Sequence, residues 1–327
     1  MSGSDSQSRQ DAGAAEGAAD PVGGDHPALI RADALADNGR WTHVDVTGAR
    51  PEETILAAAP GLSHSTLAAL TDEDTRPRVD SADGGLLLIL RGANLAPGAP
   101  VEDMISLRLW CDGRHLISCQ RRPVRAVERV RDRLIGPDSP ASAGAVLAAL
   151  VQVIVQHMTP FVDAMLEQVD DLEDTLLGTP DKSMYHGMMR LRSSVLTYRR
   201  YLRPQRDALN TLQYDPPGFL SAERGRLRET ANTLIRHLED LDTAREALQM
   251  QQEELMTMLS ARMNETLYRF SVVATIFLPL GFLTGLMGVN VAGMPGTVHP
   301  DAFWWLSGSL VLFGLGLYAW FRRKGLM

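Results

Sequence analysis

The sequence predicts an α+β membrane protein in which a cytosolic α/β module leads into a long helical stalk, continuous with the first of two C-terminal transmembrane helices. Three observations support this prediction. Segments 270–289 and 302–321 contain no Asp, Glu, Lys or Arg, and 20 apolar residues in a helix span a hydrocarbon core of about 30 Å. These are the only two membrane spans expected. Segment 226–278 contains neither Gly nor Pro, and residues 41–120 mix strand and helix patterns.

The N-terminal residues 1–25 are acidic and rich in small residues, without the apolar segment of a signal peptide, and are predicted to form a disordered extension. The two cysteines, Cys111 and Cys119, have a C-x7-C spacing that fits no zinc-ligand pattern and indicates reduced structural thiols. The net charge of −8 comes without a basic, aromatic-rich patch, so nucleic acid is not expected as a partner.

The cytosolic α/β domain is predicted over residues 40–140. PEETILAAA begins a helix, because Pro51 and two acidic residues occupy its first turn. Alternating or short apolar runs predict the strands, and a DGR turn predicts a hairpin. The expected strands are WTHVDV (41–46), GLLLILRG (85–92), and the hairpin pair 104–111 and 115–120 around 112–114.

Residues 141–269 are predicted to form a cytosolic helical stalk or funnel. Two prolines are expected to break or bend the helices of its first part, since a proline ring interrupts or kinks a helix. The expected elements are one long helix over 144–177, a break at Thr179-Pro180, and a second helix over 181–209 with a kink at Pro204.

Segment 226–278 predicts one helix of about 80 Å at 1.5 Å per residue, with no break before Pro279. Such a helix would carry force from the cytosol into the membrane. Its leucines recur every seven residues, which indicates a face that packs against other helices, either of the same chain or of sister subunits. Because the helix runs directly into a membrane span, packing against sister subunits is favoured. A plain amphipathic helix packed on its own domain is the alternative. The row is Leu227, Leu234, Leu241, Leu248 and Leu255.

Charges that flank the two spans predict the orientation of the chain. Arg262 and Arg269 precede the first span, basic residues at 322–324 follow the second, and the loop between them has no Lys or Arg. The positive-inside rule then places both termini in the cytosol of a multi-pass inner (plasma) membrane protein. A buried globular hairpin is the alternative. The expected segments are 270–290 (first span), 291–301 (outer loop), 302–321 (second span) and 322–327 (basic tail).

Catalytic motifs are missing from the sequence, which has no P-loop, no GxGxxG after a strand, no GxSxG and no HExxH. No enzyme activity and no bound cofactor are therefore expected. A cluster of carboxylates on one predicted helix suits a regulatory divalent cation at a subunit interface, although the pattern favours the alternative of a solvated helix face. The cluster is Glu167, Asp170, Asp171, Glu173 and Asp174.

The first span carries small and polar residues that suit an ion pathway. Gly281, Gly285 and Gly288 form a smooth strip, and Thr284 adds a hydroxyl. Because no carboxylate lies within the span, a pathway there would use amides, hydroxyls and carbonyls, which hydrogen-bond the water shell of a cation without removing it. The amides are Asn264 at the cytosolic entry and Asn290 at the outer exit, where a helix-capping role is the alternative.

The segment NETLYRFSVVATIFLPLGFLTGLMGVN (264–290) resembles the pore helix of the CorA superfamily of divalent-cation transporters. That superfamily ends its first span with Gly-Met-Asn, and this sequence has Gly288-Val289-Asn290 there. The branched aliphatic residue in the triplet, followed by VAGMPG, is similar to the ZntB zinc-transporter branch. The resemblance covers about residues 40 to 327 and includes TRPRVD (75–80), EDMISLRLW (102–110), RPQRDAL (203–209) and HLEDLD (237–242).

The resemblance implies a homopentamer with a cytosolic funnel, in which the first span of each subunit lines a central pore through the lipid bilayer and the second span forms an outer ring. It implies that Asn290 forms an outer selectivity ring. It also implies that Asn264, Phe270, Leu278 and Gly281 face the pore, with Phe270 and Leu278 as apolar constrictions.

Two departures from the magnesium branch of the superfamily favour Zn²⁺ as the transported cation. Gly281 stands where that branch often has Thr, and the outer loop offers only His299 and Asp301 as ionisable groups. For the similar zinc branch, proton-coupled uptake is one proposed mode. A CorA-type Mg²⁺/Co²⁺ channel is the alternative within this class. A membrane-anchored coiled-coil scaffold without transport is the alternative from another class.

Overall fold

The computed structural model describes residues 28–73, 75–100, 102–136, 139–176, 178, 182–288 and 299–324. The chain divides into two compact units, the first ending at Gln251 and the second beginning at Gln252. The predicted N-terminal extension, Val289, Asn290 and residues 291–298 of the predicted outer loop lie outside the described residues.

The first unit is built on a six-stranded mixed sheet in the order β1-β2-β6-β5-β4-β3. The pairing of β2 with β6 is parallel, and the other four pairings are antiparallel. The predicted strands and hairpin are confirmed, whereas two strands, β1 and β3, were not predicted. The strands are β1 (Leu29–Ala34), β2 (Arg40–Asp45), β3 (Arg78–Ala82), β4 (Gly85–Ala93), β5 (Met104–Cys111) and β6 (His115–Gln120).

Tight turns fix the register of the two hairpins. Between β5 and β6, Gly113 has a φ of +96°, and the Asp112 carboxylate accepts hydrogen bonds from the backbone N–H groups of Arg114 (2.7 Å) and His115 (2.6 Å). Between β3 and β4, Asp83 and Gly84 have φ values of +49° and +71°. Positive φ at both central residues is typical of a type I′ turn, so this Asp-Gly pair is the sequence signal that predicts the missed strand β3.

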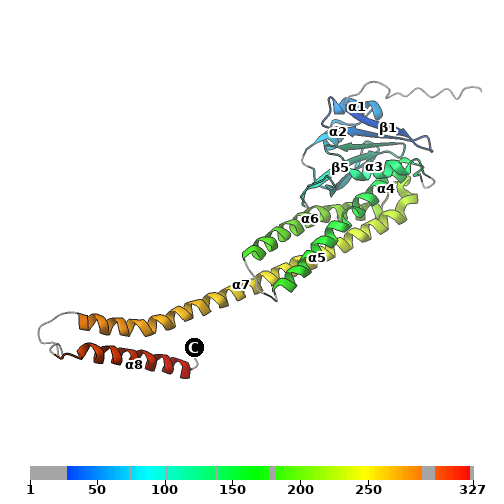
Figure 1. Ribbon diagram of the computed structural model, residues 1–327. Coiled ribbons are helices and arrows are strands. Elements are labelled where there is room, and N and C mark those ends of the chain that lie inside the picture. The colour runs from blue at the N-terminus through cyan, green and yellow to red at the C-terminus, as the bar shows by residue number, and fades with distance from the viewer. Residues whose placement is uncertain are drawn as a thin grey trace, which may run out of the picture. The chain divides into compact units, whose positions relative to one another are not determined.

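Helices cover both faces of the sheet (Figure 1). Helices α1 (Pro51–Ala58) and α2 (His64–Thr71) bury apolar residues such as Ile55, Leu70 and Trp110 on one face. Helices α4 (Ala143–Gln156) and α6 (Lys182–Tyr214) contact the sheet on the other, and α3 (Arg125–Arg133) packs on α4. The first unit therefore has three layers, with its core on both sides of the sheet.

Helix α4 corrects the expectation that only two segments are apolar enough to cross a membrane. Residues 139–162 contain no charged residue, and the α4–α5 stretch Ala143–Leu176 qualifies by length and composition. In its most apolar window 67% of the residues are buried, against 6% and 0% in the two C-terminal candidates. Since Ala143 to Val151 are all buried, α4 is a core helix of the first unit.

The single helix predicted over 144–177 is wrong, because the structure has two helices there. Helix α4 ends at Gln156, and α5 (Thr159–Leu176) begins three residues later. Pro160 explains the break: a proline ring collides with the carbonyl four residues earlier, and Gln156 holds that carbonyl. Proline is well tolerated in the first turn of the next helix. Helix α6, in contrast, continues through Pro204 to Tyr214.

Helix α7 (Arg224–Gly288) follows the short 3-10 helix η1 (Gly218–Glu223) and confirms the predicted uninterrupted helix, which also passes Pro279. In the first unit, its leucine row is fully buried within a single chain. Thr159 Oγ1 of α5 lies 3.2 Å from His237 Nε2, and Arg199 of α6 pairs with Asp242. The leucine row therefore packs on its own chain, contrary to the seam expected between sister subunits. The members concerned are Leu227, Leu234, Leu241 and Leu248.

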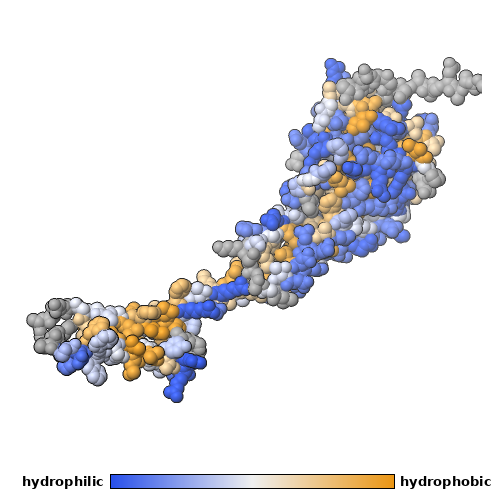
Figure 2. Space-filling model, in the orientation of Figure 1, coloured by the Kyte–Doolittle hydropathy of each residue, from blue (hydrophilic) through white to orange (hydrophobic). Residues whose placement is uncertain are grey.

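The second unit contains the C-terminal part of α7 and helix α8 (Ala302–Arg323), which match the two predicted spans by length and composition. Large apolar side chains are exposed on both helices, and the hydrophobic surface gathers there in Figure 2. A β-carbon placed on Gly314 of α8 would lie 3.5 Å from Leu280 Cδ1 of α7, so the two helices touch at this point.

Candidate ion pathway

The residues predicted to line a pathway lie on one helix, α7, except Val289 and Asn290, which lie outside the described residues. Every described member is exposed in the single chain, with Phe270 68% and Leu278 74% exposed. These members are Asn264, Phe270, Leu278, Gly281, Thr284 and Gly288.

Helical spacing places most of these residues on one face. Leu267, Ala274, Gly281 and Gly288 follow one another every seven residues and are all exposed. Phe270, Leu278 and Gly285 lie between them at intervals of three or four, so they share that face. Sequence reasoning missed Leu267 and Ala274, although counting back by seven from Gly281 finds both. We call this set, with Asn264 at its cytosolic end and Thr284 beside it, the pathway face.

The opposite face of α7 is turned toward α8. Val272 is buried there, and Ile276, Leu280 and Leu283 are partly buried. Leu280 is the residue that touches Gly314 of α8. The pathway face is thus the side of α7 that α8 does not cover.

The pathway face is open in the single chain and has few free proton donors. A β-carbon added at Gly281, Gly285 or Gly288 would meet no atom within 4 Å. The Thr284 hydroxyl lies 3.0 Å from the carbonyl oxygens of both Leu280 and Gly281, so its proton is used within the helix. Its oxygen can still accept a hydrogen bond from a water molecule of a hydrated cation.

The acidic cluster does not assemble into a metal site within one chain. Its five carboxylates lie on α5 and are all exposed. Within the described ranges, no group of three or more His, Cys, Asp or Glu side chains is close enough to hold a metal ion. A regulatory site there would need ligands from a second chain and stays a prediction. The five are Glu167, Asp170, Asp171, Glu173 and Asp174.

His299 and Asp301, the ionisable residues of the predicted outer loop, lie just before α8. Both are exposed, and the backbone N–H of Asp301 donates to His299 Nδ1 at 3.3 Å. When Nδ1 accepts, the proton of the neutral ring is on Nε2, so in this arrangement neither ring nitrogen offers a free lone pair to a metal ion.

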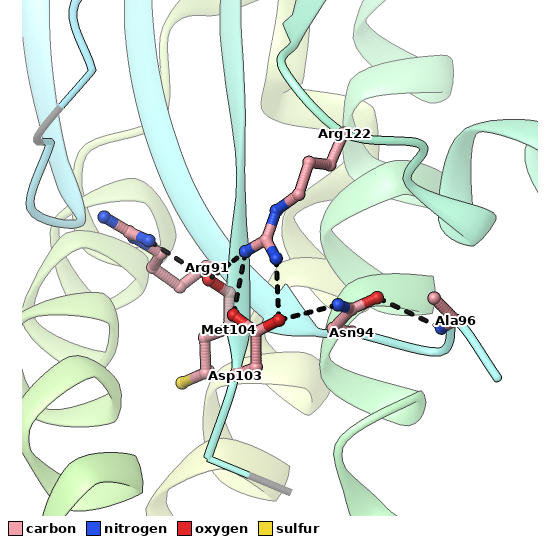
Figure 3. Close-up of polar contacts among 6 residues, drawn as sticks. All are labelled: Arg91, Asn94, Ala96, Asp103, Met104 and Arg122. Atoms are coloured by element: carbon pink, nitrogen blue, oxygen red, sulfur yellow. Dashed lines mark hydrogen bonds and ion pairs between the residues drawn. The ribbon is translucent and has the colours of Figure 1, made fainter. Parts of the chain in front are cut away.

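A polar network lies at the strand ends of the first unit, around Asp103 and Met104 of the EDMISLRLW block (Figure 3). Arg122 donates to both oxygens of Asp103 at 2.6 and 2.9 Å, and Asn94 donates to Asp103 at 2.8 Å. The hydrogen bond from Arg122 is the main cause that lowers the pKa of Asp103. Arg91 and Arg122 also donate to the carbonyl of Met104. Since donors and carboxylate are matched, this network ties β4, β5 and the end of β6 together.

Cys111 and Cys119 are buried and free, in agreement with the predicted structural thiols. Burial raises the pKa of each thiol to about 12. A protonated, buried thiol is a poor metal ligand and a poor nucleophile, so neither cysteine adds to a functional site.

Comparison with known proteins extends over nearly the whole chain. The family model for CorA-like Mg²⁺ transporter proteins matches residues 37–323. The divalent cation transporter CmaX of Pseudomonas aeruginosa is 34% identical over 299 residues, which cover 89% of this chain and 88% of CmaX. The zinc transport protein ZntB of Pectobacterium carotovorum is 32% identical over 292 residues, 87% of this chain and 86% of ZntB.

The solved structure of full-length CmaX has a similar fold. It matches with a TM-score of 0.75 at 31% identity, and the match covers 92% of this chain and 99% of that structure. The similarity therefore includes both the sheet-based unit and the two C-terminal helices.

Proposed function

The chain belongs to the CorA-like family and is a divalent-cation transporter rather than an enzyme, and we propose that Zn²⁺ is its principal cargo. The similarity to ZntB, a zinc transport protein, extends over most of both chains and supports this cargo. The pathway face of α7 is the observation that carries the proposal, because it offers an uncharged, open surface along an apolar helix.

The pathway face is proposed to line a pore made by five copies of the chain, as the family resemblance implies. Lipid chains would gain little from contact with Asn264 or with the bare backbone at Gly281 and Gly288. Small residues instead let neighbouring helices approach closely in a bilayer. Copies of α7 around a common axis would cover the sides of this face and leave its centre to water and ions.

The chemistry of the face suits a cation that keeps its water. It offers a carboxamide at Asn264, a hydroxyl oxygen at Thr284, and no ionisable side chain. Phe270 and Leu278, both strongly exposed, would form apolar rings that interrupt the water column when the pore closes. Asn290 is proposed as the outer selectivity ring, with Val289 and Gly288 completing the triplet.

The proposed orientation puts both termini in the cytosol of the inner membrane. The two C-terminal helices are long and apolar enough to span a bilayer, and α8 ends at the exposed pair Arg322 and Arg323. Cations at that end favour the cytosolic side. Aromatic residues at the start of α8, Phe303, Trp304 and Trp305, are exposed and suit the opposite interface.

A Mg²⁺/Co²⁺ channel is the second candidate, because the matching family model is described by Mg²⁺ transport. Zn²⁺ is preferred for two reasons. The ZntB relative is similar along most of its length. Gly281 also lacks the hydroxyl group that the magnesium branch often has at this position, so no ring of hydroxyls would form there.

Transport into liposomes tests the cargo. Purified protein is reconstituted into liposomes that contain a zinc-sensitive dye, and parallel liposomes contain a magnesium-sensitive dye. We expect Zn²⁺ influx well above that of protein-free liposomes. Strong Mg²⁺ flux without Zn²⁺ flux would replace the zinc assignment with the second candidate, and no flux of any divalent cation would favour the scaffold alternative.

The substitution Asn290→Ala tests the proposed selectivity ring. We expect it to abolish Zn²⁺ flux while the size of the oligomer on a sizing column stays unchanged. Gln249→Ala, which removes an exposed amide in the first unit, is the matched control and should transport normally. Normal flux through the Asn290 variant would return this residue to a capping role.

A further inference from the structure

A hollow in the first unit lies between the end of α6 and the start of α7, away from the pathway face. Its volume is about 600 Å³, which lies within the range of small-molecule sites. Its wall includes Tyr214 near the end of α6 and Arg224 and Arg228 in the first turns of α7. All its lining residues belong to the described part of the first unit.

The charge of the hollow is positive and uncompensated. Arg224 and Arg228 are four residues apart and therefore lie on the same side of α7. No Asp or Glu is among the lining residues. The backbone carbonyl of Gln213 accepts a hydrogen bond from Arg224 Nε at 3.0 Å, which orients this guanidinium and leaves its terminal nitrogens available. Arg228 makes no hydrogen bond or ion pair with the described residues.

Neighbouring arginines of α7 differ from Arg228 because they have partners within the chain. Arg226 pairs with Glu223 at 3.2 Å, and Arg236 donates to Thr233 Oγ1 at 3.0 Å. The sequence RGRLR (224–228) thus places two arginines in the hollow and one on a carboxylate. Two convergent guanidinium groups without a carboxylate are the arrangement that recognises phosphate.

Uncharged groups complete the hollow. Asn210 Oδ1 accepts from Gln213 Nε2 at 2.9 Å, so the amide nitrogen of Asn210 remains as a donor. Asn232 lies one turn beyond Arg228 and is exposed. A β-carbon added at Gly225 would meet no atom within 4 Å, so a ligand can reach the helix backbone there.

An aromatic ring stands at the edge of the hollow. Tyr214 is 75% exposed and has no ring or cation partner among the described residues. A planar base could stack on such a ring, as bases stack on aromatic side chains in nucleic-acid complexes. We propose that this hollow binds a nucleotide, with its phosphates on Arg224 and Arg228 and its base on Tyr214.

Calorimetry with ATP tests the proposal on the full-length protein in detergent. EDTA is present throughout, so that a divalent cation cannot bridge ATP to the protein. We expect saturable binding of ATP that Arg228→Gln weakens about tenfold, because it removes a charge-assisted contact. Arg236→Gln, on the same helix but outside the hollow, should bind as the unchanged protein does. Absent binding, or equal losses in both variants, would overturn the site.

Two further variants separate the phosphates from the base. Tyr214→Ala should weaken ATP several-fold and leave inorganic tripolyphosphate unaffected, whereas equal ATP binding would remove the base from the proposal. Gly225→Leu would fill the hollow without removing a donor and should abolish binding of both ligands. Gly187→Leu on α6, where an added β-carbon also meets no atom within 4 Å, is its control. Unchanged binding to the Gly225 variant would place the nucleotide elsewhere.

Discussion

Helix α7 contains two rows of residues with the same spacing and opposite surroundings. In the first unit, leucines recur every seven residues and are fully buried by other helices of the same chain. In the second unit, a row with the same period is exposed throughout, and its side chains become smaller toward the C-terminal end of the helix. A period of seven therefore marks one face of a helix, and only the fold shows whether other helices of the same chain cover that face. The rows are Leu227, Leu234, Leu241 and Leu248, and Leu267, Ala274, Gly281 and Gly288.

The largest effect is expected at the exposed row, from Gly281→Leu. In the proposed pore of five copies, five added side chains would close the pathway, so Zn²⁺ flux should fall by about a hundredfold or more. The fold should be kept, since the β-carbon position is open. Liposome flux measures this. Gly308→Leu on α8, where the β-carbon position is also open, should transport normally. Equal flux through both variants would show that this row lines no pore.

At the buried row, Leu241→Ala should lower the free energy of unfolding of the first unit by about 2–5 kcal/mol, because a buried leucine is replaced by a cavity. Cys111 and Cys119 are both buried in this unit and are the chain's two thiols, so their reactivity on heating reports its unfolding.

Leu267→Ala is the matched substitution at the exposed row. Leu267 is 58% exposed, so this substitution should leave the temperature at which the thiols become reactive nearly unchanged. If Leu241→Ala reduced the oligomer without easing thiol release, the buried row would have to pack between subunits after all.

Acid is expected to weaken the first unit specifically. Burial lowers the pKa of His43 to about 4, and burial also lowers the pKa of His237, which lies in the buried stretch of α7. As the pH falls below about 6.5, the unfolded chain takes up protons that the folded unit excludes, so stability decreases. For His43 the loss reaches about 3 kcal/mol by pH 4.

Thermal melts followed by circular dichroism between pH 7 and pH 4 measure this loss. His43→Gln should flatten the pH dependence. The described part of the second unit contains no buried histidine, so its helix content should not change in the same range. A melting temperature that does not fall between pH 6.5 and 4 would contradict the assignment of a neutral, buried His43.

The smallest effect is expected from Glu265→Gln. Glu265 pairs with Arg269 at 2.6 Å across one helical turn, but both side chains are mostly exposed. Such a pair contributes about 0.5 kcal/mol or less, and salt screens it. Melting temperature should therefore stay within error, whereas Asp242→Asn, which leaves the buried Arg199 without its partner, should lower it measurably.

Local signals agree with the tertiary structure for four of the six strands and for the long helices α6 and α7, whereas helices α2 and α3 were not predicted. The turn at Gly113 and the apolar strand β4 are examples. Strand β1 was missed because LIRADA carries polar residues and pairs at an edge of the sheet. The break between α4 and α5 depends on Pro160, and the apolar run around it concealed that signal.

The candidate pathway could be predicted from spacing, glycines and resemblance, because all of these are properties of one helix. The surroundings of the leucine row could not, since a period of seven is the same for partners within a chain and between chains. The hollow between α6 and α7 could not be predicted from the sequence either. Tyr214 and Asn210 come from one helix and Arg228 from another, and only the fold brings them to one place.

Helix α4 has a consequence for how the protein is made. Its uncharged segment leaves the ribosome about a hundred residues before the proposed first span, and it is long enough to be taken for a membrane helix. At about 5–20 residues per second, the ribosome needs on the order of ten seconds to reach the next apolar segment. Within that interval the sheet has to close over α4, before the membrane insertion machinery can capture it. Burial of α4 by the first unit is thus a condition for the proposed two-span topology.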